Sequence, residues 1–150
     1  MDGRVLPVIS NIIVTRKLNE DEINAHNFKT FSPIANTKNL LYYYRKLPDN
    51  RILFGTRGDL TGSDQSNLAM SKMMEKFLKD IFPKWSNINI EYNWRGLIAL
   101  SQKLTPSIGK IDNEEIYYGF GYNGVGVSAA PWTGKQLSKL VFSSNSKDLD

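Results

Sequence analysis

The sequence of 150 residues contains no cysteine and a single histidine. The lack of cysteine excludes disulfides, zinc–thiolate sites, iron–sulfur clusters, a thiol nucleophile and a thioether-linked cofactor. The single histidine, His26, lies in a segment without a periodic pattern, so a solvated loop position explains it better than a catalytic base or a metal ligand. We therefore expect no metal site.

Long apolar runs and one-sided charge are also missing. No run approaches the roughly 18 apolar residues that a membrane span requires, and the N-terminus lacks a basic region followed by an apolar one. The 19 basic and 15 acidic residues leave a net charge of +4 that is spread along the chain. The nearest approach to a basic stripe, Arg45, Lys46, Arg51 and Arg57, is interrupted by apolar residues. These features predict a cytoplasmic protein without a nucleic-acid partner or a membrane span.

The apolar pattern that is present predicts an α+β fold with a mixed or antiparallel sheet. Val and Ile concentrate in strand-like residues 4–17, a polar connection follows over 18–38, and a turn at 47–50 joins a β-hairpin. Apolar residues at three- and four-residue spacing, many of them Met, mark a helix over residues 65–82. We interpret its Met-rich stripe as core packing rather than a groove for a partner. Further expected elements are strands at 87–94, 97–100 and 116–120 and a helix at 125–142.

A glycine-rich turn precedes the expected C-terminal helix. Residues 119–124 read Gly-Phe-Gly-Tyr-Asn-Gly, which matches the G-x-G-x-x-G dinucleotide pattern between a strand and a helix. A primary dinucleotide-binding unit needs a second strand with an acidic end about 20 residues later, and the remaining sequence is too short for one. Gly121, Gly124 and Gly126 nevertheless allow close backbone approach to a ligand, and the helix N-terminus suits an anion or an electron-rich carbonyl. The alternative is a tight connection that binds nothing.

Several stretches together resemble the D-amino-acid oxidase superfamily, and especially its gamma-glutamylputrescine oxidoreductase-like members. They occur in the same order as in the C-terminal part of those proteins, and the resemblance covers nearly the full chain. The matching stretches are Asn39-Leu40-Leu41-Tyr42-Tyr43-Tyr44-Arg45, Asp49-Asn50-Arg51-Ile52-Leu53-Phe54-Gly55-Thr56-Arg57-Gly58, Ile90-Glu91-Tyr92-Asn93-Trp94-Arg95-Gly96, Thr105-Pro106-Ser107-Ile108-Gly109 and Gly121-Tyr122-Asn123-Gly124-Val125-Gly126-Val127.

The resemblance implies part of a two-domain flavoenzyme. Residues 1–108 would be a portion of the substrate domain, residues 109–142 the C-terminal portion of the FAD-binding domain, and residues 143–150 a disordered tail. In such proteins the last glycine turn and its helix contact the isoalloxazine ring. The residues in that position here are Gly121, Tyr122, Asn123, Gly124, Val125, Gly126 and Val127. Many relatives have histidine where this chain has Val125, and relatives with covalent flavin use a cysteine, so the resemblance implies non-covalent FAD.

The implied activity is oxidation of a C–N bond of an amine or amino acid by hydride transfer to flavin. Four residues are candidates for substrate contacts, because arginine holds carboxylates and aromatic faces flank alkylammonium groups; they are Tyr44, Arg57, Trp94 and Arg95. The chain resembles a fragment, so we expect it to need the N-terminal FAD-binding portion as a partner and to be inactive alone. The alternative is a non-catalytic α+β binding or interaction domain in which the glycine turn is only structural.

Overall fold

The computed structural model describes residues 5–38, 41–59 and 61–145, which form two compact units. We call Val8–Leu97 the sheet unit, and Met1–Pro7 together with Ile98–Asp150 the turn unit. Strands β1 (Val5–Thr15) and β5 (Ile90–Ser101) each run from one unit into the other. Within the described ranges, no helix is both long enough and apolar enough to cross a membrane.

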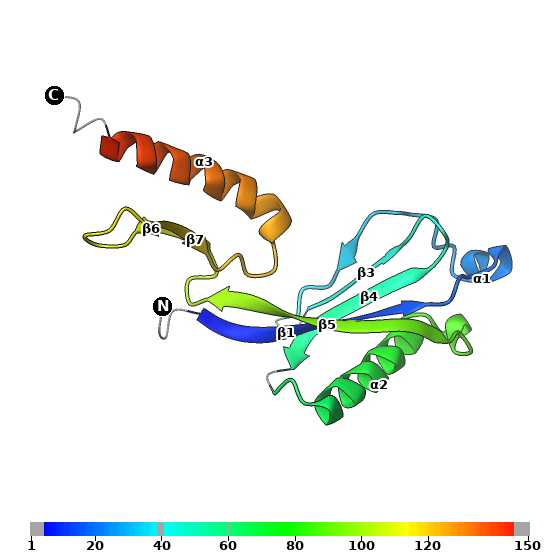
Figure 1. Cartoon of the computed structure of the whole chain (residues 1–150). Helices are drawn as coiled ribbons and strands as arrows, with labels where there is room; N and C mark the ends of the chain where they lie inside the picture. The colour runs from blue at the N-terminus through cyan, green and yellow to red at the C-terminus, as the bar shows by residue number, and fades with distance from the viewer. Residues whose placement is uncertain (1–4, 39–40, 60, 146–150) are drawn as a thin grey trace. The chain divides into compact units, whose positions relative to one another are not determined.

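The sheet has five strands in the order β2-β3-β4-β1-β5 (Figure 1). Its other strands are β2 (Ile34–Ala35), β3 (Tyr42–Lys46) and β4 (Ile52–Asp59). The predicted hairpin is confirmed, because β3 and β4 pair antiparallel from Tyr42 opposite Thr56 to Lys46 opposite Ile52. β4 also pairs antiparallel with β1, where a bulge lies between Ile9 and Ser10. The α+β fold class and its antiparallel sheet are thus as the sequence predicts.

Helix α2 (Asp64–Ile81) packs on one face of this sheet, within two residues of the range predicted for it. Its N-terminus is capped by Ser63, whose side-chain oxygen accepts the N–H of Ser66. Met74 and Leu78 point from the helix into the core, and Met74 is fully buried. The core interpretation of the Met stripe is confirmed at that position. The buried cluster comprises Ile13, Leu18, Ile23, Phe28, Ile52, Phe54, Met74, Leu78, Phe82, Trp85 and Ile88.

The segment predicted as a polar connection contains a helix, α1 (Glu20–Ala25). A capping box stabilises its N-terminus. The side-chain oxygen of Asn19 accepts the N–H of Glu22, and the Glu22 carboxylate accepts the N–H of Asn19. His26 lies in the turn after α1, as predicted, but it is half-buried rather than fully solvated. Its Nε2 accepts the backbone N–H of Lys84 at 3.1 Å, and its ring packs edge-on against Phe82 and Trp85. Trp85 belongs to the 3-10 turn η1 (Pro83–Trp85), which α1 contacts.

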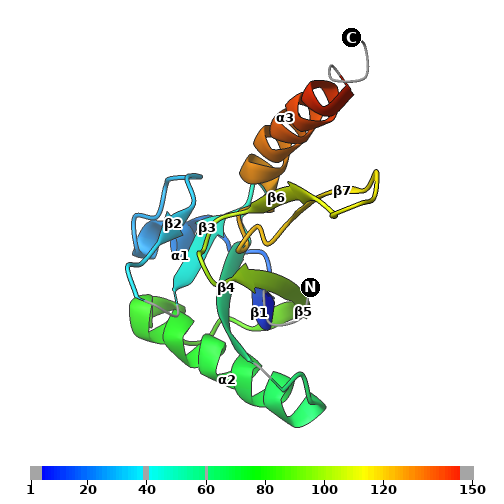
Figure 2. The same ribbon diagram turned by 90° about the vertical axis from the view of Figure 1, so that its left-hand side faces the viewer.

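Besides the ends of β1 and β5, the turn unit contains a β-hairpin and a long helix (Figure 2). β6 (Ser107–Lys110) pairs antiparallel with β7 (Tyr117–Phe120), and helix α3 (Gly126–Asn145) packs on both strands. The side chains of Thr133 and Leu137 lie directly against Gly119. The predicted helix is confirmed, although it continues to Asn145. The rest of the predicted tail, residues 146–150, lies outside the described residues. The strands predicted separately at 87–94 and 97–100 form one strand, β5.

Candidate functional site

The glycine turn between β7 and α3 has the backbone conformation that its sequence suggests. Three of its residues have positive φ angles: Gly121 at +76°, Asn123 at +56° and Gly124 at +80°. Glycine tolerates this region freely and asparagine better than other residues with side chains, so the Gly-x-Asn-Gly order fits the path of the chain. The chain thereby reverses within a few residues and enters α3 at Gly126.

The side chain of Asn123 fixes this turn to the end of β5. Its Oδ1 accepts the backbone N–H of Ser101 at 2.8 Å, and its Nδ2 donates to the carbonyl of Gly121 at 2.6 Å. Its own backbone N–H donates to the carbonyl of Ala99 at 3.1 Å. Asn123 and Ser101 are both buried, so these hydrogen bonds are shielded from competing water. The sequence places Asn123 in the candidate site, but it does not identify Ser101 as its partner.

The turn leaves the start of α3 exposed. Val125 is 53% exposed and Val127 is 98% exposed, while the ring of Tyr122 packs beside Gly126. The first N–H groups of a helix have no partner within it and carry a partial positive charge. The first turn of α3 lies within the described residues and contains no acidic side chain that would neutralise this charge. This surface can therefore receive an anion or an electron-rich carbonyl oxygen.

A second group of candidate residues lies on the sheet unit, on the face opposite α2, which we call the second face. Tyr43 occupies this face because its neighbours in β3, Tyr42 and Tyr44, pack against the core. The Tyr43 ring lies over Gly55, and a Cβ at Gly55 would be 2.2 Å from the ring. The Tyr43 hydroxyl is 3.2 Å from the Ser10 hydroxyl, a hydrogen bond across two strands. Sequence reasoning missed Tyr43, although Gly55 in a strand was a signal of such a close approach.

The structure separates the four predicted substrate residues into two pairs. Arg57 follows the core-facing Thr56 along β4, and successive side chains of a strand point to opposite faces, so Arg57 lies on the second face. It is paired in register with Ser10 of β1, which lies on the same face. Trp94 is 47% exposed and lies on the same face, because its neighbours along β5, Asn93 and Arg95, both reach α2. β1 lies between β4 and β5, so Arg57 and Trp94 stand on strands about 10 Å apart.

Tyr44 and Arg95 face the helix side instead. The Tyr44 ring contacts the rings of Phe54 and Phe82 at centroid distances of 6.0 and 5.5 Å. Arg95 donates to the carbonyl of Ser63 at 3.0 Å and to the carboxylate of Asp64 at 3.2 Å, at the N-terminus of α2. The second face therefore brings Arg57 and Trp94 together with Tyr43, and it does not include Tyr44 or Arg95.

Comparison with known proteins identifies the family. The profile of the family described as "FAD dependent oxidoreductase" (DAO) matches residues 1–140. This chain belongs to that family of flavin-dependent oxidoreductases.

Among curated proteins, the chain is 31% identical over 141 residues to "Probable oxidoreductase OrdL" of Haemophilus influenzae, covering 94% of this chain and 31% of that protein. It is also 31% identical over 138 residues to the gamma-glutamylputrescine oxidoreductase of Escherichia coli, covering 92% of this chain and 32% of the relative. The chain thus spans about a third of the length of these relatives. Among solved structures, the L-proline dehydrogenase from P. horikoshii matches with a TM-score of 0.71 at 18% identity. That match covers 93% of this chain and 36% of the dehydrogenase, and it shows a shared fold.

The family implies FAD, and the partial positive charge at the exposed start of α3 is suited to an electron-rich group of such a cofactor. The exposed start of α3 offers partial positive charge beside the exposed Gly124. A flavin carbonyl has the electron-rich oxygen that such a surface receives. The exposed residues at this surface are Gly124, Val125 and Val127, and Gly126 beside them is half-buried.

Proposed function

We propose that this chain is the C-terminal part of an FAD-dependent oxidoreductase that oxidises a C–N bond of an amine or amino acid. One observation supports the proposal most directly. In this chain of the FAD-dependent family, the N-terminus of the 20-residue helix α3 is exposed, and the turn before it is fixed by hydrogen bonds of the buried Asn123. The FAD would be bound non-covalently, since the sequence has no cysteine.

The turn unit would supply electrostatic stabilisation to the cofactor. When bound, FAD would supply the hydride acceptor for the carbon next to the amine, and its reduced form would carry more negative charge around the flavin N1 and C2 carbonyl. Backbone N–H groups at Gly126 and Val127 would donate towards that carbonyl, and the α3 dipole would add a favourable field. Asn123 would act as a positioning residue, because its hydrogen bonds to Ser101 and Gly121 hold those donors in place.

The second face of the sheet unit would contribute the substrate contacts. Arg57 offers a planar fork for a carboxylate, and the exposed Trp94 ring offers a face for an alkylammonium group. Tyr43, held over Gly55 by Ser10, presents a hydroxyl on the same face. Tyr44 and Arg95 would act from the helix side by fixing β3 and β5, in keeping with their contacts to Phe54 and Ser63.

The partner in this proposal is the N-terminal FAD-binding portion that the relatives have in addition. Helix α3 supports this, because the residues on its outer side are exposed although several are apolar. Val127, Trp132 and Phe142 are 98%, 54% and 71% exposed. An apolar helix surface of this kind is typical of an interface with another folded portion. Separated from that portion, the chain would be inactive and of marginal stability.

The test is to express the chain alone and joined to the N-terminal portion of the Escherichia coli gamma-glutamylputrescine oxidoreductase. Each sample is titrated with FAD and then mixed with gamma-glutamylputrescine or L-proline without oxygen. The proposal predicts flavin binding in the joined protein and bleaching of the oxidised-flavin band by at least one amine. An interaction domain is the better account if the joined protein folds but leaves the flavin spectrum unperturbed.

A further inference from the structure

The sheet unit contains a cavity that the proposed function does not use. It has a volume of about 520 Å³ and is open on one side. It is lined by residues of β2, β3 and the second half of α2, elements that are labelled in Figure 2, and by Asn36 and Lys38, which follow β2. Cavities of this volume are in the range that binds small molecules. It lies on the helix side of the sheet, whereas Arg57 and Trp94 lie on the second face.

The walls of this cavity are largely apolar. Tyr42 and Phe77 form an aromatic pair with ring centroids 4.7 Å apart, and Tyr42 also stacks on Phe54 at 5.8 Å. These packed rings give the cavity a rigid aromatic wall. Ile34 and the 40% exposed Ile81 complete the apolar lining. Such a surface favours a flat or branched apolar body over a hydrated polar one.

Two oppositely charged side chains, Lys38 and Asp80, line the cavity, and they differ in whether they have an ion-pair partner within the described part of the chain. Asp80 is already paired with Lys76, at 2.7 Å between Nζ and Oδ2. Lys38 has no carboxylate partner among the described residues, and its Nζ lies 5.8 Å from the centre of the Tyr42 ring. The Oδ1 of Asn36 accepts the N–H groups of Lys38 and Tyr42, which leaves its amide Nδ2 as a further donor. The Lys38 ammonium and the Asn36 amide are therefore suited to donate hydrogen bonds to an anion.

From this combination we propose that the cavity formed by Ile34, Asn36, Lys38, Tyr42, Phe77 and Ile81 binds a small carboxylic acid with an aromatic or branched apolar body. The apolar body lies against Tyr42, Phe77 and Ile81. The carboxylate accepts hydrogen bonds from the Lys38 ammonium and the Asn36 amide. The site is distinct from the second face and from the glycine turn, so its existence does not depend on the proposed oxidoreductase activity.

The test uses the 150-residue chain, labelled with ¹⁵N, under conditions in which its dispersed amide signals show that it is folded, and phenylacetate as the probe. Backbone amide shifts are followed during titration, with neutral phenylacetamide as a matched ligand. We expect saturable shifts centred on Tyr42, Phe77 and Ile81, with a dissociation constant in the millimolar range, as for a ligand of this size. Phenylacetamide should bind about tenfold more weakly, because it lacks the charge.

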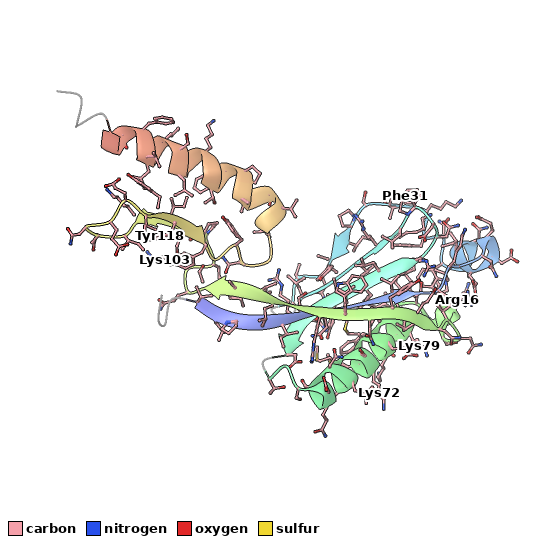
Figure 3. The ribbon with its side chains drawn as sticks, in the orientation of Figure 1. Arg16, Phe31, Lys72, Lys79, Lys103 and Tyr118 are labelled. Carbon is pink, nitrogen blue, oxygen red and sulfur yellow. The ribbon has the colours of Figure 1, made fainter. Side chains whose placement is uncertain are left out.

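Two variants separate the charged contact from the apolar one. K38Q should weaken phenylacetate about tenfold and leave phenylacetamide unchanged. I81Q, at a half-exposed position, should weaken both ligands alike. K72Q is the control, because Lys72, which is labelled on α2 in Figure 3, belongs to the same helix as Ile81 and does not line this cavity. The proposal is overturned if phenylacetate gives no saturable shifts, if its shifts centre on Arg57 and Trp94, or if K38Q binds it as the unaltered chain does.

Discussion

The side-chain Oδ1 of Asn123 accepts the backbone N–H of Ser101 at 2.8 Å, although 22 residues separate them in sequence. This hydrogen bond joins the glycine turn to the end of β5 and thereby sets where α3 begins. The start of α3 is the feature on which the proposed flavin contact depends, so the most direct structural prediction concerns Asn123.

Replacing Asn123 with Ala should lower the free energy of unfolding by about 2 kcal/mol, because its buried side-chain hydrogen bonds to Ser101 and Gly121 are lost and the Ser101 N–H is left unsatisfied. Asn113 provides a matched control: it also has a positive φ, of +61° against +56°, but it is exposed and has no side-chain hydrogen bond within the described residues. Urea unfolding of N123A and N113A should therefore differ, and equal losses would show that the backbone conformation, and not the hydrogen bonds, dominates.

The close contact between Tyr43 and Gly55 gives a second prediction. G55A should destabilise the protein by about 1–3 kcal/mol, because the added methyl group displaces the Tyr43 ring and breaks its hydrogen bond to Ser10. The double variant Y43A/G55A should be less destabilised than the sum of the single variants. G96A is the control, since a Cβ at Gly96 meets no atom within 4 Å. Additive losses in urea unfolding would contradict the contact.

Glu22 should make stability depend on acid pH. The hydrogen bond from Arg16, assisted by the N–H of Asn19, lowers the pKa of Glu22 from 4.5 to about 2. The carboxylate therefore contributes stability that is fully present above pH 4.5 and is lost as the pH falls towards 2. E22Q should cost about 1 kcal/mol at neutral pH, and its difference from the unaltered chain should vanish near the lower value.

The control for Glu22 is E75Q, because Glu75 pairs with Lys79 one turn along α2, and both side chains are half-exposed. Its removal should cost less than about 0.5 kcal/mol. Chemical unfolding across the acid range measures both variants. A constant difference between E22Q and the unaltered chain at all pH values would show that Glu22 does not titrate as its contacts imply.

In the protein joined to its FAD-binding portion, Arg57 and Arg95 should behave differently. R57Q should raise KM for a carboxylate-bearing substrate about tenfold or more, because the second face loses its charged fork. R95Q should mainly lower thermal stability, since Arg95 is engaged by Ser63 and Asp64 at the start of α2. Steady-state kinetics together with thermal unfolding distinguish the two roles. A KM effect confined to R95Q would overturn the assignment of the substrate side.

The sequence predicts the long helices and the hairpin well because their signals are local. The three- and four-residue spacing defines α2, and the Pro-Asp-Asn turn defines β3 and β4. It fails for α1, where the capping box of Asn19 and Glu22 was overlooked in a polar segment. The sequence also predicts two strands where the structure has one, since residues 95 and 96 continue β5 without interruption.

The faces of the strands were harder to predict than the strands themselves. Tyr42, Tyr43 and Tyr44 are all aromatic, so alternation within β3 cannot tell which of them faces the core. That choice depends on Phe54 and Gly55 in the neighbouring strand, opposite Tyr44 and Tyr43. In the same way, the glycine turn is visible in the sequence, but the partner of its asparagine is fixed by tertiary packing against β5.

The central claim is that the N-terminus of α3 faces the electron-rich edge of a flavin. Its most direct test is FAD affinity of the joined protein with V127D and V127N, two substitutions of similar shape at a side chain that is 98% exposed. An aspartate in the first turn interacts favourably with the helix dipole, so V127D should fold at least as stably as V127N. We predict that V127D nevertheless binds FAD about tenfold more weakly than V127N, because its carboxylate repels the flavin carbonyl. Equal FAD affinity of the two variants would contradict a flavin contact at this helix.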